Sequence, residues 1–357
     1  MSILLDAARA CAALMVLVGH MVQMEIYTGP FPFSAMMQHY AVIVFFVLSG
    51  LVIVHSVEAR STTLGEYAIA RAARILPVSL AALAFGTLVF IVVSAQGLAP
   101  TLTPEPYDRL TLTALLLPVV FLSESWHGVG PAWNPPYWSL VYEVWFYAIF
   151  GAAYFLKGRT RIAAVLLLCV VAGWRILLMM PIWWLGAALA RRGGAPFMAP
   201  ERAVLIALGG VLAMILADAF SVVAYRLMVM LHDPAGYDLR YSLYFLTDWV
   251  FAIGIAMLFI AARPLAEAAR PLLERFQHQI LWLSGLSFSL YLFHWPMLSV
   301  LSAFGIGAGD SVPAFAALAG GVVGLCALIA TVTEHRSRDI REWMRRRFAG
   351  AGRTATA

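Results

Sequence analysis

The first long apolar stretch of the chain contains three side chains that can do chemistry, Asp6, Arg9 and His20. Asp6 and Arg9 are three residues apart, so they are neighbours on a helix and can form an ion pair. His20 follows Arg9 by eleven residues, which places both on one helix face about 16 Å apart along the axis. An imidazole there could act as a general base, because its pKa lies near neutral pH. This stretch alone is explained equally well by a buried histidine bonded to a backbone carbonyl.

Two later apolar stretches also contain polar side chains. Glu143 lies about one turn inside an aromatic-rich stretch, where a carboxylate must either pair or take up a proton. Ser287, Tyr291 and His294 recur at spacings of four and three residues, which gives one polar stripe on a helix. Pro296 leaves a backbone carbonyl without its helical donor, and His294 could satisfy that group instead of reacting. The sequence leaves both roles of His294 open.

A pair of arginines precedes the third apolar stretch. Arg71 and Arg74 occupy neighbouring helical positions just before Pro77. Two guanidinium groups on one face form a good clamp for phosphate, because arginine binds oxyanions through paired hydrogen bonds. Taken alone, the pair is better explained as charge that sets the membrane topology.

The composition places these side chains on membrane helices. Of the 357 residues, 62% are hydrophobic and 12% are charged, whereas soluble domains have about 45–50% and about 25%. So few charges cannot cover a water-facing surface, which excludes a soluble enzyme, a disordered chain and a nucleic-acid-binding domain. The three cysteines lie in apolar stretches, and their spacing indicates neither a disulfide framework nor a metal site.

A membrane-spanning helix needs roughly 20 mostly apolar residues. We therefore predict an all-α fold, a polytopic membrane bundle of about ten transmembrane helices. The predicted spans are 4–24, 35–57, 75–95, 138–156, 162–178, 181–191, 203–220, 245–262, 279–302 and 312–333. The apolar run 111–122 is too short to cross, so we expect a re-entrant or interfacial segment there. Ser49-Gly50 in the second span predicts a close helix contact, because small residues let helix backbones approach.

The distribution of the 24 Lys and Arg residues orients the predicted bundle. Most of them fall in segments that ten spans place on one side, and basic loops stay in the cytoplasm. Both termini are therefore expected to be cytoplasmic. We divide the chain into an integral membrane domain, 1–335, and a basic cytoplasmic tail, 336–357. The tail could contact anionic lipid headgroups, although setting the topology is the simpler role.

Five motifs, in this order, resemble the membrane-bound acyltransferase 3 family, which acylates surface glycans and related acceptors. They are Asp6-x-x-Arg9-Ala10 with His20, Phe45-Phe46-x-x-Ser49-Gly50, Arg71-x-x-Arg74-Ile75-x-Pro77, Trp138-Ser139-Leu140-x-x-Glu143-x-x-Phe146-Tyr147 and Ser287-Phe288-Ser289-Leu290-Tyr291-Leu292-x-His294-x-Pro296. The resemblance covers nearly the whole chain. It departs from the family pattern near Ile43, where an acidic residue often stands, and at Ala70, where a second basic residue often precedes Arg71.

The resemblance implies transfer of an acyl group, most often acetyl, from acyl-CoA to a hydroxyl group. The acceptor would be a carbohydrate or a lipid-linked glycan, and the enzyme would lie in a bacterial inner membrane. Arg9, Arg71 and Arg74 would hold the phosphates of the donor. No permanently bound cofactor and no metal are expected, and the oligomeric state is left open.

The resemblance also suggests catalytic roles. His20 would be the general base that takes the proton of the acceptor hydroxyl. Glu143 would orient or polarise a reacting group, with His20 as one possibility. His294 and Tyr291 could donate hydrogen bonds to the developing oxyanion. Direct attack needs fewer steps than an acyl-histidine intermediate, but the sequence does not separate the two.

Two other classes of protein have comparable features. A secondary transporter or flippase for a glycan or lipid precursor would also have about ten spans and buried polar residues. A non-catalytic subunit of glycan assembly would tolerate the loss of His20. The segment 96–137, with Trp126, His127 and Trp133, could hold a sugar by aromatic contact or form a packed lid.

Overall fold

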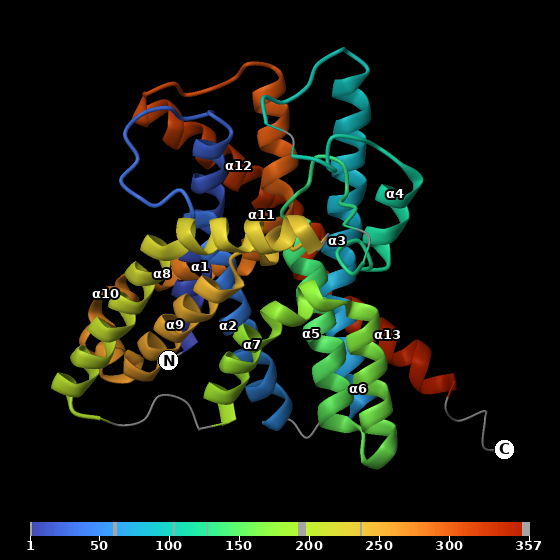
Figure 1. Ribbon diagram of the computed structural model, residues 1–357, viewed down its shortest axis with the longest axis vertical. Helices are drawn as coiled ribbons and strands as arrows, with labels where there is room; N and C mark the ends of the chain where they lie inside the picture. Colours follow the sequence, from blue (N-terminus) through green and yellow to red (C-terminus); the bar gives the residue numbers. More distant parts are fainter. Residues whose placement is uncertain are drawn as a thin grey trace.

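The computed structural model describes residues 2–59, 63–102, 104–126, 128–191, 198–235 and 238–351. Within these ranges the chain forms helices and no sheet, which confirms the predicted all-α class (Figure 1). The elements are α1 (Ser2–Gln23), α2 (Met37–Glu58), α3 (Leu64–Ser94), α4 (Leu112–Val119), α5 (Tyr137–Phe155), α6 (Gly158–Ala172), α7 (Trp174–Arg191), α8 (Pro200–Ala235), η1 (Arg240–Ser242), α9 (Phe245–Ala268), α10 (Arg270–Arg275), α11 (Gln277–Ala303), α12 (Val312–Val332), η2 (Glu334–Arg336) and α13 (Ser337–Ala351).

Within the described ranges, seven helical segments are long and apolar enough to cross a membrane. They are α1, α2, α3, α8, α9, α11 and the continuous run from α12 into α13. The protein is therefore an integral membrane protein with a polytopic helical bundle. The run predicted to be too short to cross is α4, a helix of eight residues.

The other three predicted spans differ from simple transmembrane helices. The predicted span 138–156 is α5, which is not among these seven segments. The predicted spans 162–178 and 181–191 are α6 and α7, which meet at 119°. The bend is at Gly173, whose φ of +83° suits glycine better than any other residue. A bent pair of this kind is a broken span or a re-entrant loop.

Glycines bring α2 and α7 into close contact. A Cβ atom added to Gly50 of α2 would overlap the carbonyl oxygen of Trp183 in α7. In the same way, a Cβ atom on Gly186 of α7 would overlap the carbonyl oxygen of Val47 in α2. This reciprocal arrangement confirms that Ser49-Gly50 allows a second helix to approach.

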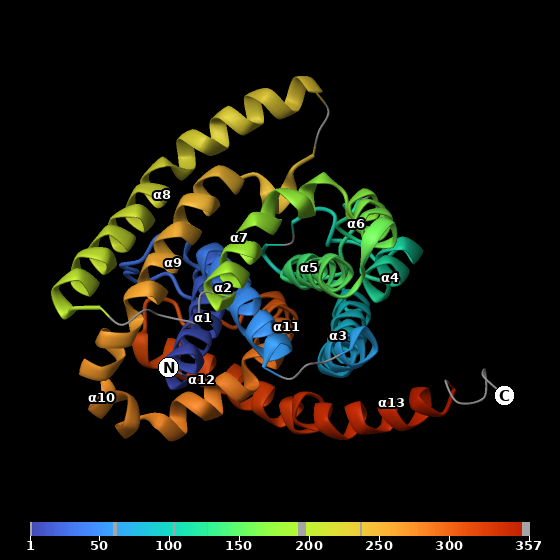
Figure 2. The same cartoon turned by 90° about the horizontal axis from the view of Figure 1, so that it is seen from below.

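The bundle has a centre of closely packed helices, with further helices along its sides. Figure 2 shows α2 and α11 near the middle, with α3 and α5 on one side and α8 and α9 along the other. The first turns of α1 and α3 and the connection between α5 and α6 lie at one end, which we call the basic end (Figure 1). The opposite end, which we call the far end, holds the loops 96–111 and 304–311.

Candidate active site

A cavity of about 290 Å³ lies between α1, α2, α3, α5 and α11. Arg9, Arg71 and Arg74, the predicted donor-binding residues, all line it. Glu143 and Tyr291 line the same cavity, although they come from α5 and α11. The structure thus brings together five of the predicted site residues, which lie on four different helices.

The three arginines lie at the basic end of the cavity and have different surroundings. Arg9 pairs with Asp6 at 3.5 Å, as the sequence predicts, and the Ser284 hydroxyl donates to the same Asp6 carboxylate. The guanidinium group of Arg71 lies 5.8 Å from the centre of the Tyr147 ring. The Nε of Arg71 is buried without a hydrogen-bond acceptor. This group is therefore available to an oxyanion that enters the cavity.

A hydrogen-bonded chain runs along the wall of the cavity. The Tyr147 hydroxyl donates to Oε1 of Glu143, and it lies 2.9 Å from the Ser49 hydroxyl. The indole N–H of Trp183 donates to Ser49 at 3.1 Å. Because Tyr147 gives its proton to Glu143, Ser49 must donate to Tyr147. We predicted a packing role for Ser49; its hydroxyl also belongs to this chain, which ends on a carboxylate.

His20 and His294 form a direct pair beside the cavity rather than in its lining. Nδ1 of His20 lies 2.8 Å from Nε2 of His294, and the two rings are nearly parallel with centroids 5.0 Å apart. Nδ1 of His294 lies 3.0 Å from the carbonyl oxygen of Leu290. Tyr291 links the pair to the cavity, because its ring centroid lies 6.0 Å from that of His294.

The hydrogen bonds of this pair assign the tautomers of both rings when they are neutral. A carbonyl oxygen can only accept, so His294 must carry its proton on Nδ1 and donate it to Leu290. Nε2 of His294 is then an acceptor, and His20 must donate to it from Nδ1. Nε2 of His20 consequently has a free lone pair. The geometry suits a general base whose orientation is fixed by a second histidine.

Glu143 and Tyr291 have partners that the sequence does not reveal. Glu143 is bonded to Tyr147, and the partner of His20 is His294. The Tyr291 hydroxyl donates to the carbonyl oxygen of Pro136 at 2.9 Å and lies 2.6 Å from the Ser139 hydroxyl. The hydroxyl proton of Tyr291 is therefore already donated to the N-terminal end of α5.

Asn134 takes over the structural one of the two roles left open for His294. Pro296 frees the carbonyl oxygen of Leu292, and Nδ2 of Asn134 donates to that oxygen at 3.1 Å. His294 instead bonds to Leu290 and His20, and its side chain is fully buried. The broken helical bond therefore does not require His294.

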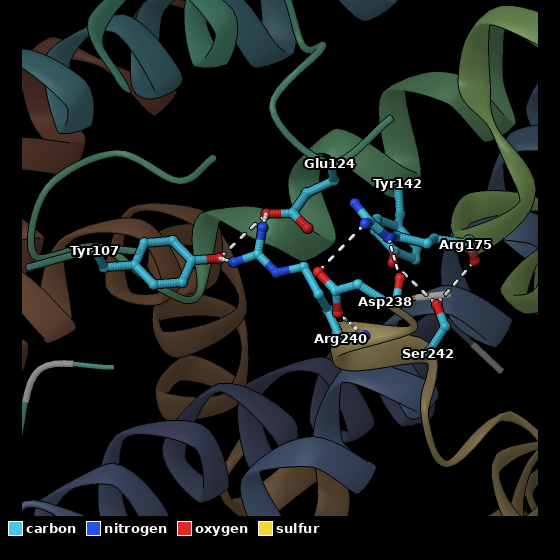
Figure 3. Close-up of polar contacts among 7 residues, drawn as sticks. All are labelled: Tyr107, Glu124, Tyr142, Arg175, Asp238, Arg240 and Ser242. Carbon is cyan, nitrogen blue, oxygen red and sulfur yellow. Dashed lines mark hydrogen bonds and ion pairs between the residues drawn. The ribbon is translucent and has the colours of Figure 1, made fainter. Parts of the chain in front are cut away.

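A second polar cluster, which sequence reasoning missed, connects Tyr107 of the loop 104–111 to Glu124 and Arg240 (Figure 3). We call it the far-end cluster. The Glu124 carboxylate accepts from the Tyr107 hydroxyl at 3.1 Å and pairs with Nη1 of Arg240 at 3.3 Å. Arg175 at the start of α7 pairs with Asp238 at 3.3 Å. Burial raises the pKa of Glu124 from 4.5 to about 7, and the Arg240 guanidinium limits the rise. These loop residues carry no periodic pattern, so nothing in the sequence joins them.

An aromatic stack lies next to this far-end cluster, because the Arg240 guanidinium lies 5.6 Å from the centre of the Tyr241 ring. Trp138 of α5 lies between His39, with centroids 6.2 Å apart, and Tyr241, with centroids 4.6 Å apart. Both neighbouring rings are nearly parallel to the indole. We call these three residues the ring stack. Ser139, the next residue after Trp138, already lines the cavity.

The loop tryptophans favour a packed lid over a sugar-binding surface. Trp133 is buried and packs against Phe90, with ring centroids 5.3 Å apart. Trp126 is exposed, but its indole N–H donates to the Val170 carbonyl oxygen at 2.9 Å. His127 lies outside the described residues.

The described part of the chain holds no group of three or more His, Cys, Asp or Glu residues that could bind a metal. The chain matches the family model Acyl_transf_3, described as an acyltransferase domain, over residues 3–331. No curated protein and no solved structure matches it. All the predicted site residues lie within the matched region.

Proposed function

Because the chain belongs to the Acyl_transf_3 family of acyltransferase domains, we propose that this integral membrane acyltransferase acts on a hydroxyl group of a carbohydrate or glycan-like acceptor. The donor is acyl-CoA, in the first place acetyl-CoA. The His20–His294 pair, beside a cavity with three arginines at its basic end, is the observation that carries the proposal. We further propose that the basic end faces the cytoplasm of a bacterium, in agreement with the positive-inside rule.

The arginines of the cavity hold the phosphates of the donor in this proposal. Arg71 and Arg74 come from one helix, and Arg9 reaches the same cavity from α1. Guanidinium groups suit phosphate because their donors match its oxygens in pairs. The bond between Tyr147 and Glu143 keeps an aromatic ring beside the Arg71 guanidinium, which positions this arginine on the cavity wall. The thioester arm of the donor then extends toward Tyr291 and the histidine pair.

His20 performs the proton transfer. As the acceptor oxygen bonds to the thioester carbon, its proton passes to Nε2 of His20, and the carbonyl electrons move onto the carbonyl oxygen. The carbon–sulfur bond then breaks, and the departing thiolate takes the proton from His20. While His20 is protonated, its bond to His294 becomes charge-assisted and therefore stronger. We propose direct transfer, since an acyl-histidine intermediate adds a step without using a further residue of the site.

The proposal is tested in a strain that lacks the gene, complemented with wild-type or variant protein. Mass spectrometry of the surface glycans should show acyl groups with the wild type and none with His20→Ala. Purified His20→Ala should still bind acetyl-CoA with unchanged affinity, because the arginines are intact. The double variant Arg71→Ala with Arg74→Ala is the comparison for this binding measurement, and its affinity for acetyl-CoA should fall.

Three results would contradict the proposal or a part of it. Full acylation with His20→Ala removes His20 as the base. A deletion strain that keeps its acylation but no longer moves a glycan or lipid precursor across the membrane indicates a transporter or flippase instead. Unchanged affinity of the double arginine variant for acetyl-CoA removes the arginines from donor binding.

A further inference from the structure

The proposed reaction creates a negative charge on the carbonyl oxygen of the acyl group. Such a charge needs hydrogen-bond donors that already point at its position. The two predicted donors are both used within the protein. Tyr291 gives its proton to the Pro136–Ser139 turn, and His294 gives its Nδ1 proton to Leu290. The site therefore needs a donor that sequence reasoning did not identify.

Trp295 is the next residue after His294 on α11, and it contacts the proposed base directly. The ring centroids of Trp295 and His20 lie 4.7 Å apart, and the planes meet at 76°. The side chain is 2% exposed, and its Nε1 is buried without a hydrogen-bond acceptor. An indole nitrogen can only donate, and an unsatisfied buried donor destabilises a folded protein. A protein keeps such a group where it has another use.

Other tryptophans of this protein use their indole N–H in structural bonds. Trp145 donates to the carbonyl oxygen of Phe121, and Trp249 donates to that of Leu178, both at 2.8 Å. Trp295 is the tryptophan of the described chain whose buried indole nitrogen has no acceptor. One turn further along α11, the Ser299 hydroxyl is also buried without a partner.

We propose that Trp295 is a catalytic residue whose indole N–H donates a hydrogen bond to the acyl carbonyl oxygen during transfer. This role rests on the proposed function, because it requires an acyl group beside His20. The hydrogen bond from the indole N–H is weak while the thioester carbonyl is neutral. It becomes charge-assisted when the π electrons of the carbonyl move onto its oxygen during attack. The proton of the acceptor meanwhile goes to Nε2 of His20. Trp295 therefore gains or loses no proton itself.

The test compares Trp295→Phe with Trp295→His. Phenylalanine keeps a ring at this position and removes the N–H, whereas histidine retains a ring nitrogen that can donate. The assay is the rate of CoA release from acetyl-CoA by membrane vesicles of the complemented strain, corrected with vesicles of the deletion strain. We expect Trp295→Phe to lower kcat by about 10²-fold with an unchanged KM for acetyl-CoA. Trp295→His should recover at least part of that loss.

Trp249→Phe is the matched control, because it removes an indole N–H whose acceptor is a backbone carbonyl of α7. It should lower the melting temperature of the purified protein and leave kcat unchanged. Trp295→Phe should lower kcat and leave the melting temperature unchanged, since the indole N–H of Trp295 makes no hydrogen bond in the folded protein.

A normal kcat in folded Trp295→Phe would overturn the inference. So would equal losses in Trp295→Phe and Trp295→His, which would mean that only the shape of the indole matters. If Trp295→Phe does not fold, the rate of CoA release per folded Trp295→His protein decides, because a donor role predicts a measurable rate in that variant. Activity in His20→Ala contradicts the proposed function itself, whereas a normal rate in Trp295→Phe alone contradicts only this inference.

Discussion

His294 determines which nitrogen of His20 is available for the proposed proton transfer. The carbonyl oxygen of Leu290 fixes the proton of His294 on Nδ1, and His294 in turn fixes the proton of His20 on Nδ1. Nε2 of His20 is left unprotonated, and the pair contains no carboxylate. Two neutral imidazoles can hold this arrangement in an apolar interior, where a buried carboxylate would be costly.

Replacing His294 should therefore impair proton transfer more than donor binding. In His294→Ala, Nδ1 of His20 loses its acceptor, and the ring can adopt the wrong tautomer. We expect kcat to fall by about 10³-fold, since a wrong tautomer in a comparable triad costs about 10⁴. His294→Gln is the control, because its amide oxygen can still accept from His20 and should retain more activity. A normal kcat and pH–rate profile in His294→Ala would show that His20 needs no orienting partner.

The sequence predicts the identities of these residues better than their partners. Arg9, Arg71, Arg74, Glu143 and Tyr291 do meet in one cavity. The pairing of His20 with His294 joins two helices that are separated by 274 positions in the chain. No periodicity within one helix contains that information, because it arises only when α1 packs against α11.

The contact between α2 and α7 shows how an element positions the site. Ser49, which belongs to the hydrogen-bonded chain of the cavity wall, immediately precedes Gly50. Trp183, which donates to Ser49, lies on the facing helix. The close approach at Gly50 and Gly186 therefore brings the donor and acceptor of this bond together.

Gly186→Ala should separate these helices. Its Cβ atom would overlap the carbonyl oxygen of Val47, and a backbone atom cannot move aside as a flexible side chain can. We expect a loss of about 1–3 kcal/mol in the free energy of unfolding, the usual cost of overpacking. Thermal unfolding in detergent measures it. Gly324→Ala on α12 is the control, since its Cβ atom would meet no atom within 4 Å. Equal melting temperatures for the two variants would contradict this account.

Helix existence was predictable, but helix geometry was not. Each predicted span except 162–178 lies almost entirely within one helix, because long apolar runs leave the backbone no other way to satisfy its hydrogen bonds in a membrane. The bend between α6 and α7 lies at Gly173, whereas the predicted boundary lay between 178 and 181. From the sequence, a glycine among apolar residues is predicted to lie within a helix. The sharp bend at this glycine depends on tertiary contacts, which the sequence does not show.

At the scale of the whole molecule, the far-end cluster joins segments that are remote in the sequence. Glu124 and Tyr107 belong to the long loop before α5, and Arg240 belongs to the connection between α8 and α9. Arg240 adopts a positive φ of 46°, which is uncommon for a residue with a side chain. The cluster therefore holds two otherwise independent loops against each other.

Stability should depend on pH through Glu124. Burial raises its pKa to about 7 in the folded protein, whereas the ordinary value is 4.5. Between these values the folded state binds more protons than the unfolded state, so stability falls as the pH rises from about 4.5 to about 7 and is level above that. The effect is about 3 kcal/mol at most. Melting temperatures of the wild type and of Glu124→Gln across this range measure it.

Glu124→Gln should remove the pH dependence that Glu124 causes. The amide of the glutamine does not titrate, so the melting temperature of this variant should change less between pH 5 and pH 7. The same slope in both proteins would assign the pH dependence to other groups. A wild-type protein that becomes more stable over this range would contradict the raised pKa.

The ring stack of His39, Trp138 and Tyr241 has a bioenergetic consequence. Protons cross proteins along files of water molecules, and a polar passage open at both ends of the bundle would carry such a file through the bilayer. Trp138 packs against Phe46 of the cavity lining, with ring centroids 6.0 Å apart. Its stacking partner Tyr241 lies 5.6 Å from the Arg240 guanidinium of the far-end cluster. We therefore expect these rings to interrupt any such file, so that the protein leaves the electrical resistance of the membrane intact, which proton-leak measurements in proteoliposomes would check.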